Sequence, residues 1–288
     1  MARSLLQRLL IAVGLLPTTA GTAECPDPAR FQAEVVEVLQ RAFPEQAAHP
    51  GPDDVIQAGG FAFGLENLRK LVCALPSSDP EERERVIREH FQRGFRSVAD
   101  LPSGKKFDWV AAREHVVVQL VMEDRAERMN VLRRPLVQGV AVVVVLDMPT
   151  AYAYVGEEPP TRWGVSREEL FARAIDNLAR RTRGEMRSSG DGVERVLFVG
   201  ELDGYDAARI LTPRLRKAAA GLLGDPFRAS IPNRDFLVMW ARGNTKLAEQ
   251  AGANARRDFE AQPYPISPLI LEVWADGRIA AVPSVAPR

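Results

Sequence analysis

The densest group of residues able to do chemistry is the run Asp-Gly-Tyr-Asp-Ala-Ala-Arg-Ile-Leu at positions 203–211. It brings together the carboxylates of Asp203 and Asp206, the phenol of Tyr205 and the guanidinium of Arg209. Side chains three or four positions apart lie on one face of a helix, so Tyr205, Asp206 and Arg209 would be neighbours there. A guanidinium held by a carboxylate can present its remaining edge to a carboxylate or phosphate of a ligand.

The same run is also typical of a helix start. We expect a helix over residues 205–223, and Asp203 would then accept a hydrogen bond from one of its first backbone N–H groups. Asp206 would lie near the positive end of the helix dipole. The sequence does not decide between a cap and a ligand site.

A second polar group, Asn233-Arg234-Asp235, follows Pro232 and precedes an expected strand over residues 236–240. It is either a turn in which Asp235 bonds its own backbone or a set of site residues at a strand entrance. Whether this group meets the run 203–211 depends on strand order, which the sequence does not reveal. Aspartate and asparagine oxygens suit a hard cation, but no known ligand spacing is present, and we predict no metal and no cofactor.

Evidence for nucleophilic catalysis is thin. The three histidines, His49, His90 and His115, all lie in the first half of the chain, away from both polar groups. No G-x-S-x-G, H-E-x-x-H, phosphate-loop or dinucleotide-binding spacing occurs. Cys25 and Cys73 have neither the Cys-x-x-Cys spacing nor histidine partners that a zinc or redox motif needs. It therefore stays open whether the protein is an enzyme.

The elements that would position the second half alternate between strands and helices. Residues 140–146 contain five valines, typical of a strand covered on both faces. Further strands are expected over 193–200 and 236–240. Ser166, with Glu169 three residues on, predicts the start of a helix that runs to about residue 181. We expect an α/β (α+β) fold, with a single mixed β-sheet and packed helices, built on these strands.

The first half is expected to be a helix-rich lobe. Apolar residues recur at helical spacing over residues 28–43, 65–75 and 78–95. We place this N-terminal lobe at residues 24–130 and an α/β C-terminal lobe at 131–282. Residues 283–288 form a tail.

Charge and hydropathy argue against a nucleic-acid partner and against a membrane-spanning segment. The 38 basic and 38 acidic residues give a formal net charge of zero, which leaves no excess of positive charge for a phosphate backbone. We therefore expect no nucleic-acid partner. No segment approaches the roughly 20 apolar residues of a membrane span, so we expect no integral membrane segment.

The first 23 residues permit two interpretations. Arg3 and Arg8 precede an uncharged run over residues 9–16, followed by small residues, which is typical of a secretory signal with cleavage after Ala20 or Ala23. The leucines of this segment also fall on one helix face, as in an amphipathic helix that docks on the protein body. If a signal is removed, Cys25 and Cys73 could pair in an oxidising compartment.

Four segments in order carry a resemblance to a known family. They are Ala-Ile-Asp-Asn-Leu at 174–178, the run at 203–211, Ile-Pro-Asn-Arg-Asp at 231–235 and Pro-Ile-Ser-Pro-Leu at 265–269. In this order and spacing they resemble the YtpQ-like bacterial proteins, catalogued as domain of unknown function 1444, over about residues 130–282. The resemblance implies a bacterial protein of uncharacterised function, usually without an export signal. It brings no catalytic residue.

These observations lead to one prediction of function. We expect a non-enzymatic binding or interaction protein whose partner is a small anionic ligand or another protein. The alternative is a hydrolase that uses the aspartates, with a divalent metal. The expected location is the cytoplasm, and export with signal cleavage is the alternative. The predicted site gathers Asp203, Tyr205, Asp206, Arg209, Asn233, Arg234 and Asp235.

Overall fold

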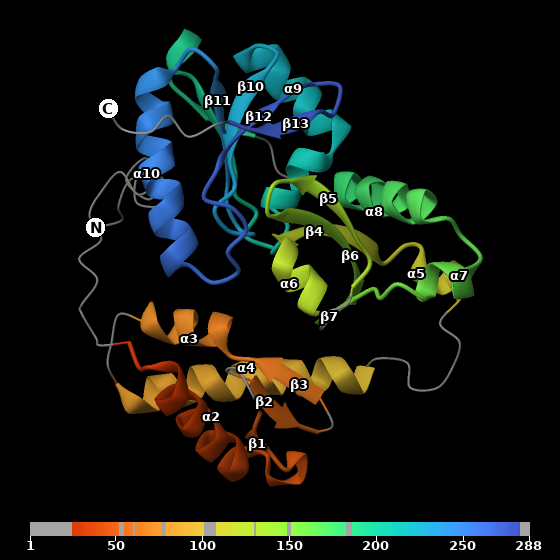
Figure 1. Ribbon diagram of the computed structural model, residues 1–288, viewed down its shortest axis with the longest axis vertical. Helices are drawn as coiled ribbons and strands as arrows, with labels where there is room; N and C mark the ends of the chain where they lie inside the picture. Colours follow the sequence, from red (N-terminus) through yellow and green to blue (C-terminus); the bar gives the residue numbers. More distant parts are fainter. Residues whose placement is uncertain are drawn as a thin grey trace. The chain divides into compact units, whose positions relative to one another are not determined.

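The computed structural model describes residues 25–51, 55–59, 61–75, 79–100, 108–129, 131–148, 151–182 and 186–282. The segment 1–23 and the tail 283–288 lie outside these ranges. The chain forms two compact units that divide near residue 104, between α4 (Pro80–Asp100) and α5 (Trp109–Ala112) (Figure 1). The sequence placed this boundary near residue 130. The difference arises because β4 (Val116–Met122) pairs along its whole length with β6 (Val140–Met148) and so belongs to the C-terminal unit.

The N-terminal unit is helix-rich, as expected. Its remaining elements are α2 (Pro28–Ala42), η1 (Pro44–Gln46), β1 (His49–Pro50), β2 (Val55–Ala58), β3 (Phe61–Gly64) and α3 (Glu66–Cys73). The three short strands form an antiparallel sheet in the order β1-β2-β3. Phe31, Val35 and Leu39 point from α2 into a core that they share with Leu68 of α3 and Phe91 of α4. The helical spacing of these residues thus reflects one buried face.

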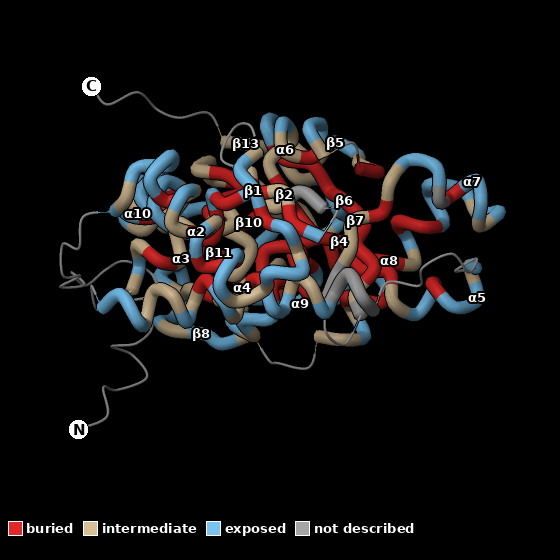
Figure 2. The backbone as a smooth tube through the Cα atoms, turned by 90° about the horizontal axis from the view of Figure 1, so that it is seen from below, coloured by how far each residue is buried: buried red, intermediate tan, exposed pale blue. Residues whose placement is uncertain are grey.

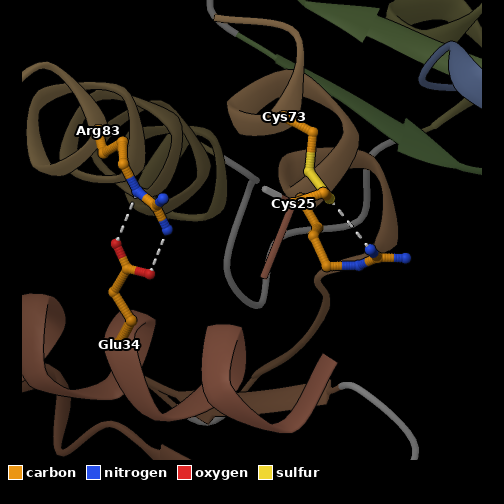
Figure 3. The surroundings of a disulfide bond; sticks show 5 residues. Cys25, Glu34, Cys73 and Arg83 are labelled. Carbon is orange, nitrogen blue, oxygen red and sulfur yellow. Dashed lines mark hydrogen bonds and ion pairs between the residues drawn. A yellow bond between two sulfur atoms is a disulfide. The ribbon is translucent and has the colours of Figure 1, made fainter. Parts of the chain in front are cut away.

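Two contacts tie the helices of this unit together (Figure 3). Cys25, just before α2, forms a disulfide with Cys73 at the end of α3. Arg83 of α4 binds Glu34 of α2 in a bidentate manner, from Nε to Oε1 at 3.1 Å and from Nη2 to Oε2 at 2.6 Å. The structure therefore pairs the two cysteines that the sequence left unassigned.

The C-terminal unit contains two sheets, and the expected helix-and-sheet class is confirmed. One sheet has the order β4-β6-β5, with β7 also paired to β6, and includes β5 (Arg133–Val137) and β7 (Ala151–Tyr154). The other has the order β13-β12-β10-β11-β9-β8. Its strands are β8 (Arg187–Ser189), β9 (Val196–Val199), β10 (Phe227–Ser230), β11 (Leu237–Ala241), β12 (Ile270–Val273) and β13 (Ile279–Ala281).

This arrangement corrects the expected single mixed sheet. Every pair of described strands is antiparallel, and β6 lies in a different sheet from β9 and β11. The valine run nevertheless forms the predicted strand, because β6 is central in its sheet and its residues 140–146 are all buried (Figure 2). A run of valines indicates burial on both faces, but it carries no information about strand direction.

Side-chain alternation along β11 shows how the six-stranded sheet is covered. Leu237 and Met239 face the main core, together with Leu215 and Ala219 of α9 (Pro213–Leu223). Val238 and Trp240 face the other way and pack with Ala251 of α10 (Thr245–Ala261). Successive strand residues point to opposite faces, so the uninterrupted apolar run of β11 indicates a sheet with a helix on each side.

The remaining helices of this unit are α5, α6 (Glu123–Arg128), α7 (Pro159–Trp163) and α8 (Arg167–Arg181). Ser166 caps α8 by accepting a hydrogen bond from the backbone N–H of Glu169, as predicted. A short 3₁₀ turn, η2 (Gly192–Glu194), precedes β9. Across the described ranges, no helix combines the length and the apolar character needed to cross a membrane.

One predicted helix is interrupted. Instead of a single helix over residues 205–223, the structure has a 3₁₀ helix, η3 (Ala207–Leu211), and then α9. Thr212 between them is extended, with φ −81° and ψ 127°. Proline disfavours helical backbone in the residue before it, so Pro213 explains the break at Thr212.

Candidate functional site

The guanidinium of Arg209 lies fully buried at the centre of the run 203–211. Nη1 donates to Asp206 Oδ1 at 2.9 Å and to Asp203 Oδ1 at 2.8 Å, and Nη2 donates to Asp203 Oδ2 at 2.7 Å. Nε donates to Thr182 Oγ1 at 3.1 Å. Glu201 Oε2 lies 3.7 Å from Nη2. Each nitrogen of Arg209 therefore already has a partner, and the guanidinium keeps no edge for an external anion.

Asp206 closes the loop that precedes η3. Its buried carboxylate accepts hydrogen bonds from the backbone N–H groups of Glu201 at 3.0 Å and Leu202 at 2.9 Å, in addition to the contact with Arg209. Asp203 Oδ1 also accepts a hydrogen bond from the Tyr205 N–H at 3.1 Å. Asp203 therefore bonds the backbone of the loop before η3 and does not cap the predicted helix, because η3 begins only at Ala207 and has no side-chain cap. Asp206 likewise binds backbone on its N-terminal side rather than the first turn of a helix.

Burial and pairing shift the protonation equilibria of this group. Burial raises the pKa of Asp206, and the hydrogen bonds from Leu202 and Glu201 and the charge of Arg209 offset only part of that effect. Burial acts on Asp203 in the same direction, but hydrogen bonds and attraction from Arg209 outweigh it and lower the pKa of Asp203. Burial would lower the pKa of Arg209, yet its contacts with Asp203 and the other carboxylates outweigh this and raise it. Arg209 is therefore charged at neutral pH.

Two residues that the sequence did not single out complete the polar group. Thr182 follows α8 and accepts the hydrogen bond from Arg209 Nε. Gln119 is buried in β4, and its amide donates to the carbonyl of Gly204 at 3.2 Å and accepts from the Tyr154 hydroxyl at 3.1 Å. Gln119 is the single polar residue in the strand Val-Val-Val-Gln-Leu-Val-Met, and this break in an apolar run is the sequence signal that could have identified it as a site residue. No local pattern marked Thr182.

The second polar group meets the first. The Ala207 N–H donates to the carbonyl of Arg234 at 3.0 Å, which links the start of η3 to the segment 231–235. The Arg234 guanidinium lies 3.3 Å from the centre of the Tyr264 ring and bonds Asp235 from Nε at 3.3 Å. Asn233 Oδ1 accepts from the Asp235 N–H at 3.0 Å, so the side chain that bonds the backbone of this turn is that of Asn233 and not, as the sequence had suggested, that of Asp235. The structure thus brings all seven predicted residues into one region, although Tyr205 is buried there.

Two residues in this region have an unusual backbone conformation. Leu202 has φ 55° and Tyr264 has φ 57°, and Ala47 in the other unit is the third non-glycine residue with positive φ among those described. This conformation costs a residue with a side chain roughly 1–2 kcal/mol. The Leu202 side chain is also 75% exposed. The site therefore holds a strained, solvent-facing leucine beside its charged residues.

The residues of this region form a buried polar core, Asp206 and Arg209, with partly exposed charged residues such as Glu201 and Asp203 around it. Within the described ranges, no group of three or more His, Cys, Asp or Glu side chains is placed so that it could hold a metal ion. Comparison of the chain with protein-family models, with curated proteins and with solved structures finds no match. The resemblance to the YtpQ-like proteins stays a hypothesis.

Proposed function

We propose that the chain is a non-enzymatic binding protein whose C-terminal unit docks a partner protein at a rim centred on Leu202. The rim consists of Leu202 and the partly exposed charged side chains of Glu201, Asp203, Arg234 and Asp235. The observation that carries the proposal is the conformation of Leu202. A large apolar side chain is held out into solvent by a backbone that is itself unfavourable.

The buried polar core explains how this conformation persists. Asp206 fixes the N–H groups of Glu201 and Leu202, and Arg209 fixes Asp206. Strained residues persist where the surrounding structure over-determines them, and they gather at binding and switch regions. A rigid apolar contact that needs no ordering on binding favours affinity.

The charges of the rim favour a protein over a small anion. Three carboxylates, of Glu201, Asp203 and Asp235, accompany the one guanidinium of Arg234. Arg209 has no remaining edge to offer, so an anionic ligand would have to displace Asp203 from it. A partner with an apolar pocket flanked by basic side chains complements this surface. The hydrolase alternative finds no supporting contact among the described residues.

Leu202→Gly is the sharpest test of this proposal. Glycine adopts positive φ without steric cost, so the variant should be as stable as the parent or more stable. It should nevertheless lose the partner, because the apolar contact is gone. Parent and variant would be compared by photo-crosslinking in extracts of the source cells, followed by mass spectrometry of the crosslinked partner, and by thermal melting.

Leu222→Ala is the matched control, because Leu222 is another exposed leucine of the same unit, 46% exposed on α9. It should keep the crosslinked partner. The proposal fails if Leu202→Gly captures the same partner as the parent. It also fails if an anionic metabolite raises the melting temperature of the parent but not of Asp203→Asn, since this would identify a small-ligand site instead.

A further inference from the structure

The disulfide of the N-terminal unit lies at the surface. Cys25 is exposed and Cys73 is half-buried. Cys25 also borders a surface groove of about 890 Å³, which is lined further by Arg30, Arg69 and Arg83 and by Asp27, Glu34 and Glu37. A small molecule in solution can therefore approach one sulfur of the bond without unfolding of the unit.

A guanidinium faces that sulfur. Arg69 lies one helical turn before Cys73 on α3, and its Nη1 donates to Cys25 Sγ at 3.4 Å. Its Nε is buried and has no hydrogen-bond partner in the described part of the chain. No ion pair joins Arg69 to a carboxylate among the described residues, whereas Arg83 in the same groove is bound by Glu34. The charge of Arg69 is thus directed at the sulfur.

We propose that Cys25–Cys73 is a thiol–disulfide exchange site, at which a small thiol reduces the bond reversibly and Arg69 assists. Reactive cysteines occur in electropositive, partly exposed surroundings, and exposed disulfides are the labile ones. At Cys25 the sulfur is contacted by the guanidinium of Arg69, and the residue is exposed. A disulfide with a purely structural role needs neither an open groove nor an adjacent cation.

The reaction balances with a small thiol as the reductant. The thiolate of the first thiol bonds to Cys25 Sγ, the Cys25–Cys73 bond breaks, and Cys73 leaves with the electron pair and takes a proton from water. The thiolate of a second thiol attacks the outer sulfur of the mixed disulfide and releases Cys25 as a thiolate, which then takes a proton from water. The products are the protein dithiol and the oxidised small disulfide. Arg69 attracts the anionic thiolate in the first step and stabilises the Cys25 thiolate in the second.

Reduction would separate the chain before α2 from the end of α3. The bidentate contact between Glu34 and Arg83 would still join α2 to α4. The core shared by α2, α3 and α4 would also remain, so we expect the reduced unit to be less stable but still folded, and the reaction to be reversible.

The rate of reduction by glutathione tests this proposal on the full-length protein. The folded parent is incubated with increasing glutathione, quenched with a maleimide and weighed by mass spectrometry. We expect a rate proportional to glutathione concentration, and a rate roughly three- to ten-fold lower for Arg69→Gln at low salt. Arg69→Lys keeps the charge and should react nearly as the parent does. Arg88→Gln, on the exposed face of α4, should not change the rate.

Two results would overturn the proposal. The first is a parent rate that stays constant as glutathione rises, because the bond is then reduced only after the unit unfolds. The second is an Arg69→Gln rate equal to that of the parent. If Arg69→Gln does not fold, the concentration dependence of the parent and the rate of Arg69→Lys decide the question.

Discussion

Arg83 and Arg209 each pair with a carboxylate at hydrogen-bond distance, but in different surroundings. Arg83 and Glu34 keep 22% and 32% of their side chains exposed and join two helices of the N-terminal unit. Arg209 and Asp206 are fully buried and fix a loop of the C-terminal unit. A partly exposed pair contributes about 0–1 kcal/mol, whereas removing one partner of a buried pair costs about 3–5 kcal/mol.

The difference matches how each unit is held together. The C-terminal unit has an extensive core built from two sheets and several helices, and it can bury charge inside that structure. The N-terminal unit has a smaller core, one short sheet and a crosslink between Cys25 and Cys73. Small units bury a smaller share of their surface and more often need covalent or metal crosslinks. We infer that buried polar contacts stabilise one unit and the disulfide stabilises the other.

Tryptophan fluorescence can separate the two units experimentally. All four tryptophans, Trp109, Trp163, Trp240 and Trp274, belong to the C-terminal unit. Far-ultraviolet circular dichroism reports on helices of both units. A destabilising substitution in the C-terminal unit should move the urea unfolding transition that is detected by fluorescence. A destabilising substitution in the N-terminal unit should leave that transition in place and move only the unfolding transition that is detected by circular dichroism.

The largest expected effect is that of Asp206→Ala. It leaves the N–H groups of Glu201 and Leu202 without their acceptor and removes one carboxylate from the buried Arg209. We expect a loss of about 3–5 kcal/mol in the free energy of unfolding, detected by fluorescence. Asp191→Ala is the control, because Asp191 is fully exposed near Arg195 and its replacement should leave the urea midpoint nearly unchanged. Equal losses in the two variants would refute the contrast between buried and exposed carboxylates.

The second effect is that of replacing both cysteines by serine. The disulfide spans a sequence separation of 48 residues, and its loss should cost the N-terminal unit about 2–4 kcal/mol. The transition seen by circular dichroism should move to lower urea, while the fluorescence transition should stay in place. A shift of the fluorescence transition by the same amount would show that the two units unfold together.

The smallest effect is a difference in pH dependence between the parent and Asp203→Asn. The pKa of Asp203 is lowered in the folded state, so its contribution to stability is present above the ordinary aspartate value and is lost as pH falls through the lowered value. The pKa of Asp206 is raised, so its contribution to stability has the opposite pH dependence: it is present at low pH and is lost as pH rises through the raised value. Asp206 is present in both proteins, so this contribution does not affect the difference between them.

We therefore expect parent and variant to differ most at pH 7 and to converge as pH falls below about 4. Urea midpoints by fluorescence at a series of pH values would measure the convergence. A gap that stays constant down to low pH would mean that Asp203 stabilises the loop through hydrogen bonds alone.

The sequence by itself determined the elements that depend on local chemistry. Ser166 with Glu169 predicted the start of α8, and the valines of β6 predicted a buried strand. The spacing of Phe31, Val35 and Leu39 predicted the buried face of α2. Each of these patterns reflects contacts within a few residues or the burial of one face, so it can be read along the chain. Pro213 is an equally local signal, and it separates η3 from α9 within the helix predicted over residues 205–223.

Only the tertiary structure decided what the polar residues do. Asp206 and Arg209 have the spacing of either a ligand site or an ion pair, and the choice depended on Thr182 and Asp203, which fill the remaining donors of the guanidinium. The contact between Arg234 and the start of η3 depended on strand order. The pairing of Cys25 with Cys73 depended on the path of the chain, which brings the two cysteines together although 48 residues separate them. Contacts between distant segments are set by the packing of whole elements, and no local pattern encodes that packing.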